Sequence, residues 1–467
     1  MPSTNAKVAR AAPEVENVRR AIVQRYRSRT PGSAHYYARA SEALAGGTTG
    51  NLRFFEPYPL YFASGSGSHV QDVDGNQYVD CFLCNGPLLL GHRHPRIMGA
   101  IRQQEDIGSI VVNPPLAVDM AERVTRVVPC AQRVRFLNSG TEAVITAVRL
   151  ARAYTGRTKV VKFLGHYHGQ DDQFLVGLDA AGTAFGAGIT ANARADTLLC
   201  PYGDIDSLQA LLGSSDSTAA VILDPAMHAG GLWGSSPEYL QAVRELTRRR
   251  NIVLIFDEVI TGFRIALGGA QSLYGVTPDL ATFGKALAAG EKLAAVAGHE
   301  EFMRGVVPGG PAVTAVFQSG TYNDGTAALA AAAAAISEYR ELDRQGAYRT
   351  LIGRARKLAA GIREIFRSKA VPCHVNQLGP MLQLFLTNAE PHFETITRAP
   401  TWPLALFYLA LINEGILLSL PTSNHIYLSF VHTDADIDGI LSKVAAVLDA
   451  YDFAAVVRAA CEENSVA

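Results

Sequence analysis

Between about residue 96 and residue 330, short apolar runs alternate with helical segments. The apolar runs are RVRFLN (133–138), KVVKFLG (159–165), AAVILDP (219–225) and NIVLIFDE (251–258). The segments between them carry apolar residues at helical spacing, as in TEAVITAVRLARAYTG (141–156). Alternation of this kind is typical of a mostly parallel sheet with helices on both faces. We therefore predict an α/β fold.

The rest of the chain predicts a second, smaller α+β domain. Residues 1–95 begin with a charged helix and continue with turn-rich sequence, in which DGN (74–76) indicates a hairpin. After residue 330 the chain is helical and then mixed, with strand candidates GPMLQLFLT (379–387) and HIYLSFVHT (425–433). We expect segment 1–95 to contribute to the small domain, 96–330 to form the large domain and 331–467 to complete the small one.

Composition argues against several classes of protein. Lys and Arg number 42 against 43 Asp and Glu, with no basic stripe that would favour nucleic acid. No apolar stretch is long enough to span a membrane, and the N-terminus lacks the apolar region of a secretory signal. Six cysteines in 467 residues do not form a disulfide framework. We expect a cytoplasmic protein that binds neither nucleic acid nor a membrane.

Ligands of open parallel sheets bind beyond the carboxyl ends of the strands, and NSGTEA (138–143) follows such an end. Ser139 and Glu142 fit a capping box, and Gly140 lets the backbone approach a ligand closely. The N–H groups at the start of the following helix suit a phosphate. A plain helix cap is the alternative, and this segment alone does not decide between the two.

The segment GHYHG (165–169) follows the next apolar run. Its two histidines, like those of GHRHP (91–95), lack the spacing of a helical zinc site, and we expect no metal. The alternative is that Tyr167 offers its flat face to a planar ligand, with clearance from the neighbouring glycines.

Two charged residues emerge from apolar surroundings. Asp257 ends a buried strand, where an ionised carboxylate is costly unless a cation meets it. Lys285 follows a short apolar strand in DLATFGKALAAG (279–290), and burial would lower the pKa of its amine and free it to form a Schiff base. A surface lysine that begins a helix is the alternative, and spacing alone favours it. A phosphate-binding turn, an aromatic ring, a buried carboxylate and a lysine together suit pyridoxal 5′-phosphate. Asp257 would then contact the protonated ring nitrogen of this cofactor.

As an ordered set, these motifs resemble those of the class III pyridoxal-phosphate-dependent aminotransferases. The likeness is strongest to the branch that contains glutamate-1-semialdehyde 2,1-aminomutase and β-amino-acid aminotransferases. It is carried by RFLNSGTEAVITAVRLARAYTGR (135–157), GHYHG, IFDEVITGFR (255–264), TFGK (282–285), SGTYND (319–324), NGPLLLGHRHP (85–95) and LSFVHTDADID (428–438). The resemblance implies a fold-type-I large domain and a homodimer with active sites at the subunit interface.

The resemblance also implies a role for each matching residue. Lys285 forms the Schiff base, and Asp257 is the partner of the ring nitrogen. The remaining cofactor contacts are Tyr167 and Val259 on the two ring faces, Ser139, Gly140 and Thr141 on the phosphate, and Thr321 on the phosphate from the neighbouring subunit.

The chain departs from the family pattern in two places. Asp224, in LDPAMHAGG (223–231), replaces a glutamate, which leaves His228 as the nearest polar candidate for the cofactor's phenolic oxygen. Glu291 and Lys292 stand where the family has an apolar residue and a proline. Glu291 could recognise an amino-bearing substrate tail, or the two could be a solvated surface pair. Arg53 falls near a substrate-carboxylate arginine of the aminomutase branch.

We predict a pyridoxal-phosphate-dependent aminotransferase that moves an amino group from an amino acid or amine donor to a keto or aldehyde acceptor. The reaction would proceed through a Lys285 aldimine, with the freed lysine as general base and acid. An aminomutase or epimerase on the same cofactor is the alternative. A non-catalytic dimeric binding module is a third hypothesis, against which Lys285 and Asp257 together argue because a binding module needs neither.

Overall fold

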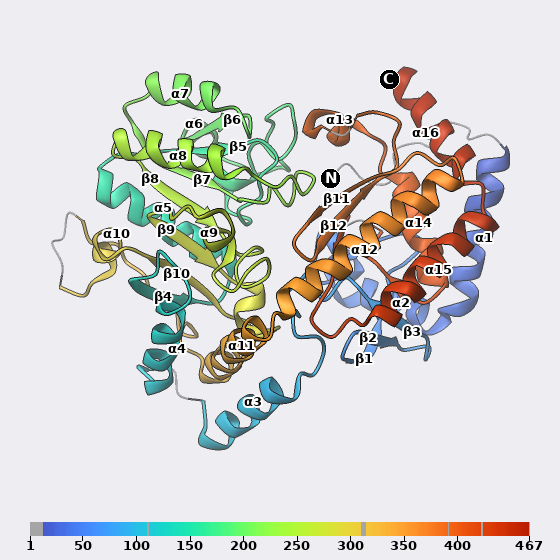
Figure 1. The fold of residues 1–467 in the computed structure, drawn as a ribbon, viewed down its shortest axis with the longest axis horizontal. Helices are drawn as coiled ribbons and strands as arrows, with labels where there is room; N and C mark the ends of the chain where they lie inside the picture. The colour runs from blue at the N-terminus through green and yellow to red at the C-terminus, as the bar shows by residue number, and fades with distance from the viewer. Residues whose placement is uncertain (1–12, 110–111, 310–313, 391, 422–423, 467) are drawn as a thin grey trace. The chain divides into compact units, whose positions relative to one another are not determined.

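The computed structural model describes residues 13–109, 112–309, 314–390, 392–421 and 424–466 (Figure 1). The chain divides into two compact units. We call residues 86–89 and 95–348 the large unit, and residues 1–85, 90–94 and 349–467 the small unit.

The large unit contains a seven-stranded sheet in the order β4-β10-β9-β8-β7-β5-β6. Its strands are β4 (Arg133–Leu137), β5 (Lys159–Phe163), β6 (Thr197–Cys200), β7 (Thr218–Leu223), β8 (Val253–Asp257), β9 (Leu280–Phe283) and β10 (Ala294–Gly298). The neighbours from β9 to β6 run parallel, and only β10 pairs antiparallel, with β4 and β9. The predicted α/β class with a mostly parallel sheet is confirmed.

The large unit also contains nine helices in its described residues, and it extends beyond the expected limit at residue 330. They are α3 (Pro95–Ile107), α4 (Pro115–Thr125), α5 (Gly140–Thr155), α6 (Ala191–Ala195), α7 (Ile205–Gly213), α8 (Pro237–Arg249), α9 (Gly269–Tyr274), α10 (Glu300–Met303) and α11 (Thr326–Arg344). Helix α11 belongs to the large unit because its buried alanine-rich face packs on α3 and α4.

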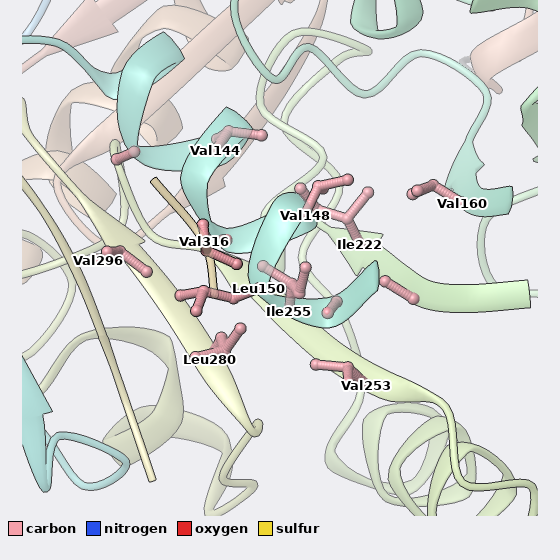
Figure 2. Packing of buried hydrophobic residues seen from close by; sticks show 14 of the residues in the cluster. Val144, Val148, Leu150, Val160, Ile222, Val253, Ile255, Leu280, Val296 and Val316 are labelled. Carbon is pink, nitrogen blue, oxygen red and sulfur yellow. The ribbon is translucent and has the colours of Figure 1, made fainter. Parts of the chain in front are cut away.

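Helix α5 anchors the core of the large unit. It begins at the N-cap Ser139 and ends at Gly156, whose φ of 69° satisfies the left-handed position that commonly closes a helix. Figure 2 shows its apolar face, including Val144, Val148 and Leu150, packed against Ile222, Ile255 and Leu280 of the strands. This packing holds the start of α5 at the same edge of the sheet as the ends of the parallel strands.

The register of the parallel strands brings their carboxyl ends together. Leu223 pairs with Phe256, and Asp257 pairs with Thr282. The segments that follow β5, β7, β8 and β9 therefore leave the sheet at one edge, where ligands bind in folds of this class.

The small unit contains two sheets, in the orders β1-β2-β3-β13 and β11-β12-β14. The strands are β1 (Phe62–Ser66), β2 (His69–Asp72), β3 (Gln77–Asp80), β11 (His374–Leu378), β12 (Met381–Phe385), β13 (Ile416–Leu417) and β14 (His425–Tyr427). The predicted hairpin at 74–76 joins the antiparallel strands β2 and β3. Of the two later candidates, β12 forms as expected, whereas β14 covers only the first residues of its apolar run.

The helices of the small unit are α1 (Pro13–Arg29), α2 (Pro31–Ala43), most of α12 (Ala347–Ser368), α13 (Phe393–Arg398), α14 (Trp402–Asn413), α15 (Asp434–Ala450) and α16 (Phe453–Val466). Helix α14 is buried on nearly every side, and it packs against α1 and α15. Within the described ranges of both units, no helix combines the length and hydropathy needed to cross a membrane.

Candidate active site

The start of α5 forms a capped turn at the carboxyl edge of the large sheet. The Ser139 hydroxyl accepts the N–H of Glu142 at 3.3 Å, and the Glu142 carboxylate accepts the N–H of Ser139 at 3.0 Å. The expected capping box is therefore present. The N–H groups of Gly140 and Thr141 belong to the same helix end, where backbone N–H groups and the helix dipole favour an anion.

Two glycines allow other segments to approach this turn closely. A Cβ on Gly140 would lie 3.0 Å from Cγ2 of Val259, in the segment after β8. A Cβ on Gly169 would lie 2.5 Å from Oγ1 of Thr141, and its φ of 104° is one that other residues rarely adopt. The GHYHG segment, the turn at the start of α5 and Val259 thus lie together.

Asp257 ends β8 with its side chain buried among three hydrogen-bond donors. Its Oδ2 lies 2.7 Å from Nδ1 of His168. Its Oδ1 accepts from Oγ1 of Thr282 and from the N–H of Val259, both at 3.1 Å. These bonds fix the direction of the carboxylate and offset the cost of burying its charge.

Neither His168 nor Thr282 is among the site residues expected from the sequence. Burial lowers the pKa of His168, so the neutral ring donates its Nδ1–H to Asp257. Its position in the segment that follows β5, at the ligand-binding edge of the sheet, is the signal that could have identified it. Thr282 is the register neighbour of Asp257, and only the pairing of β8 with β9 identifies it.

Lys285 follows β9 and begins a short 3₁₀ turn, Lys285–Ala288. Burial lowers the pKa of its amine to about 8, and the charge of Arg264 adds to this, whereas Asp257 and Asp224 act in the opposite direction. An amine with this pKa has an appreciable neutral fraction near neutral pH, and the neutral amine is the nucleophilic form.

The segment after β7 forms a tight turn around Asp224. The buried Asp224 carboxylate accepts the N–H groups of Ala226 and His228, both at 2.9 Å. The N–H of Asp224 donates to Nδ1 of His166 at 3.0 Å. Burial raises the pKa of Asp224 to about 7. His228 is buried in this turn.

The other expected site residues are exposed to different degrees. Tyr167 is 47% exposed, so its ring is open to a ligand. Thr321 is exposed in a turn whose Asn323 side chain accepts from Asn138 of the same chain at 3.0 Å. Glu291 is exposed just past the Lys285 turn, as is Lys292.

Arg53 is exposed in the small unit, on the turn Asn51–Arg53. The roles expected for Arg53, Glu291, Thr321 and His228 stay predictions.

The chain is similar in sequence to a family of known enzymes. Residues 55–448 match the family model for the class-III aminotransferases (Aminotransferase class-III). The chain is 36% identical over 416 residues to glutamate-1-semialdehyde 2,1-aminomutase 2 of Brevibacillus brevis, which covers 87% of this chain and 95% of that protein.

Two solved structures have the same fold. An omega-transaminase from Sphaerobacter thermophilus matches with a TM-score of 0.83 and 32% identity, covering 89% of this chain and 97% of that one. A glutamate-1-semialdehyde-aminomutase from Pseudomonas aeruginosa PAO1 in complex with PMP matches with a TM-score of 0.85 and 26% identity, covering 93% and 98%.

Proposed function

Because the chain belongs to the class-III aminotransferase family, we propose that it moves an amino group from an amino acid or amine donor to a keto or aldehyde acceptor. Its cofactor is pyridoxal 5′-phosphate. The observation that carries the proposal is the amine of Lys285, with a pKa of about 8, at the same sheet edge as the buried Asp257 carboxylate.

The residues at this edge fit the cofactor. The turn at the start of α5 offers N–H groups to a phosphate, and Gly140 has no side chain to obstruct it. We infer that Ser139, Gly140 and Thr141 hold the phosphate, with Tyr167 and Val259 on the two ring faces. Asp257 then meets the protonated ring nitrogen with a carboxylate that His168 and Thr282 already orient.

When bound, the cofactor supplies an aldehyde that takes the substrate's amino group and a ring that withdraws electrons from the neighbouring carbon. The Lys285 amine would take the proton from the substrate carbon that bears the amino group, and as an ammonium group it would then serve as the proton donor. Its lowered pKa suits this exchange, because a base that works near neutral pH must be neutral there and readily protonated.

Further residues complete the proposed site. Thr321 contacts the phosphate from the neighbouring subunit of a homodimer, and His228 is the candidate for the phenolic oxygen. Arg53 binds a substrate carboxylate through its planar guanidinium, and Glu291 contacts an amino-bearing tail. These four assignments rest on the family resemblance and on residue chemistry.

An intramolecular amino transfer is the second candidate. The similarity to an aminomutase over nearly the whole chain favours it, and the same residues would serve it. In that reaction the amino group returns to a neighbouring carbon of the same molecule, so no separate acceptor is consumed.

A panel of amino donors and of keto and aldehyde acceptors, read by product mass, tests the proposal. Transamination converts one donor and one acceptor into two new products. An isomer formed from a single amino aldehyde, with no transfer to any acceptor, would establish the mutase instead. Lys285→Ala should abolish either reaction, whereas Lys292→Ala, at an exposed lysine nearby, should retain it.

A further inference from the structure

Lys285 has an unusual backbone conformation. Its φ is 43°, and Ala289, at the other end of the same turn, has a φ of 49°. Residues other than glycine rarely adopt this left-handed region, because their Cβ crowds the following carbonyl oxygen. Such conformations persist only where the surrounding structure over-determines them. Contacts from outside the turn must therefore hold it.

Tyr339 of helix α11 provides one such contact. Its side chain is fully buried, and its hydroxyl donates to the carbonyl oxygen of Ala286 at 2.8 Å. The same oxygen accepts the N–H of Ala289 at 3.3 Å. A single acceptor thus ties the residue after Lys285 and the far end of the turn to a helix of the large unit.

A ring stack joins this contact to the segment that follows Asp257. The ring of Tyr339 stacks on Phe263, with centroids 6.0 Å apart, and Phe263 packs on Phe283 at 5.8 Å. Phe263 also has a positive φ, 60°, and its carbonyl oxygen accepts the Tyr348 hydroxyl at 2.6 Å. Two tyrosine hydroxyls therefore hold carbonyl groups at left-handed turns on the two segments that carry Asp257 and Lys285.

We propose that Tyr339 is a positioning residue for Lys285 and acts on the lysine through the Ala286 carbonyl; the proposal rests on the proposed function. Without the hydroxyl, the turn gains freedom and the amine moves toward water. Asp257, Asp224 and Arg264 are the charges that act on the amine, and burial is the largest cause of its lowered pKa. Greater access to water therefore raises that pKa and reduces the neutral fraction.

The test compares Tyr339→Phe with a matched control, Tyr26→Phe. Tyr26 is also fully buried, and its hydroxyl donates to the Tyr58 carbonyl at 2.8 Å in the small unit. Two quantities are measured besides thermal stability: the pH dependence of the rate at which the apoprotein takes up pyridoxal phosphate, and kcat and KM of the holoenzyme. Uptake reports the neutral amine directly, since only that form attacks the aldehyde.

For Tyr339→Phe we expect the midpoint of the uptake profile to move to higher pH and kcat to fall about 10-fold, with a smaller change in KM. Tyr26→Phe should lose a similar amount of thermal stability and keep the wild-type midpoint and kcat. Should Tyr339→Phe not be recovered folded, Tyr339→Met takes its place, because it also lacks the hydroxyl and fills the space flexibly.

A wild-type midpoint and kcat in the folded Tyr339 variant would overturn the inference alone. A wild-type holoenzyme that carries no cofactor on Lys285 would overturn the proposed function, and the inference with it. The two failures are therefore distinguishable.

Discussion

The Nδ1 atom of His168 lies 2.7 Å from Oδ2 of Asp257, and both side chains are buried. His168 lies in the segment after β5, and Asp257 is the last residue of β8. In the sheet, β7 lies between these two strands. Because burial lowers the pKa of His168, the ring is a neutral donor and leaves the negative charge on Asp257. The pair thus presents an oriented carboxylate to a cationic ring nitrogen.

His168→Phe should weaken cofactor binding and lower kcat, each by about 10-fold, because Asp257 loses an oriented donor. Phenylalanine keeps the aromatic contact with Phe174, whose centroid lies 6.0 Å away. His168→Asn provides the matched variant, since its Nδ2–H can replace Nδ1–H. Absorbance titration of the apoprotein and steady-state kinetics would check both. Equal losses in the two variants would mean that the ring's packing matters and its hydrogen bond does not.

Asp257→Asn should preserve cofactor binding better than turnover. A neutral amide still fills the space and accepts from Thr282, but it no longer stabilises the protonated ring nitrogen. We expect kcat to fall about 100- to 1,000-fold, as when one preorganised electrostatic group is removed. The dissociation constant of the cofactor, measured beside kcat, separates the two effects. Parallel losses in both would assign Asp257 the role of an anchor only.

The sequence could predict the strands of the large unit because each is short, apolar and bounded by turn residues, as β8 is. The positions of Asp257 and Lys285 at the carboxyl edge of the sheet were predictable for a related reason, because each is a charged residue at or just after the end of an apolar strand. The link from His168 to Asp257 was not, because it depends on the order of β5, β7 and β8 in the sheet. The contact with Thr282 likewise depends on register.

The C-terminal boundary of the large unit could not be predicted from the sequence either, because it depends on how α11 packs. The alanine-rich sequence of α11 predicted a buried helix, but not the surface on which that helix packs. The buried position of Tyr339 follows from that packing and has no local signature.

Lys162→Met should change the pH dependence of stability. Lys162 is fully buried on β5, its amine donates to the carbonyls of Phe174 and Val176 at 2.9 and 2.7 Å, and burial lowers its pKa to about 7 from the ordinary 10.5. The unfolded chain therefore binds more protons between these values, and this group makes stability rise with pH across that window. The gain over the window is on the order of 5 kcal/mol, at about 1.4 kcal/mol for each pKa unit between 7 and 10.5.

Chemical denaturation at several pH values between 7 and 10.5 would check this expectation for Lys162→Met. Relative to wild type, the variant should lose the rise in unfolding free energy. Lys159→Met, at a half-buried lysine of the same strand, is the control and should keep the rise. Parallel wild-type and Lys162→Met curves would show that this amine does not titrate in the window.

Mixing Lys285→Ala protomers with Thr321→Ala protomers should recover activity. If each site takes Lys285 from one chain and Thr321 from the other, a heterodimer contains one intact and one doubly impaired site. Activity should approach about half of the wild-type value per heterodimer, by that count of sites. Confirmed subunit exchange without recovery would place both residues in the same chain's site.

Borohydride reduction of the holoprotein, followed by peptide mapping by mass spectrometry, tests directly whether Lys285 is the residue that binds the cofactor covalently. We expect the mass of the reduced cofactor on the peptide that contains Lys285, a residue that follows β9 at the ligand-binding edge of the sheet and whose amine has a lowered pKa. A cofactor adduct on any other lysine, or no adduct on the holoprotein, would contradict it.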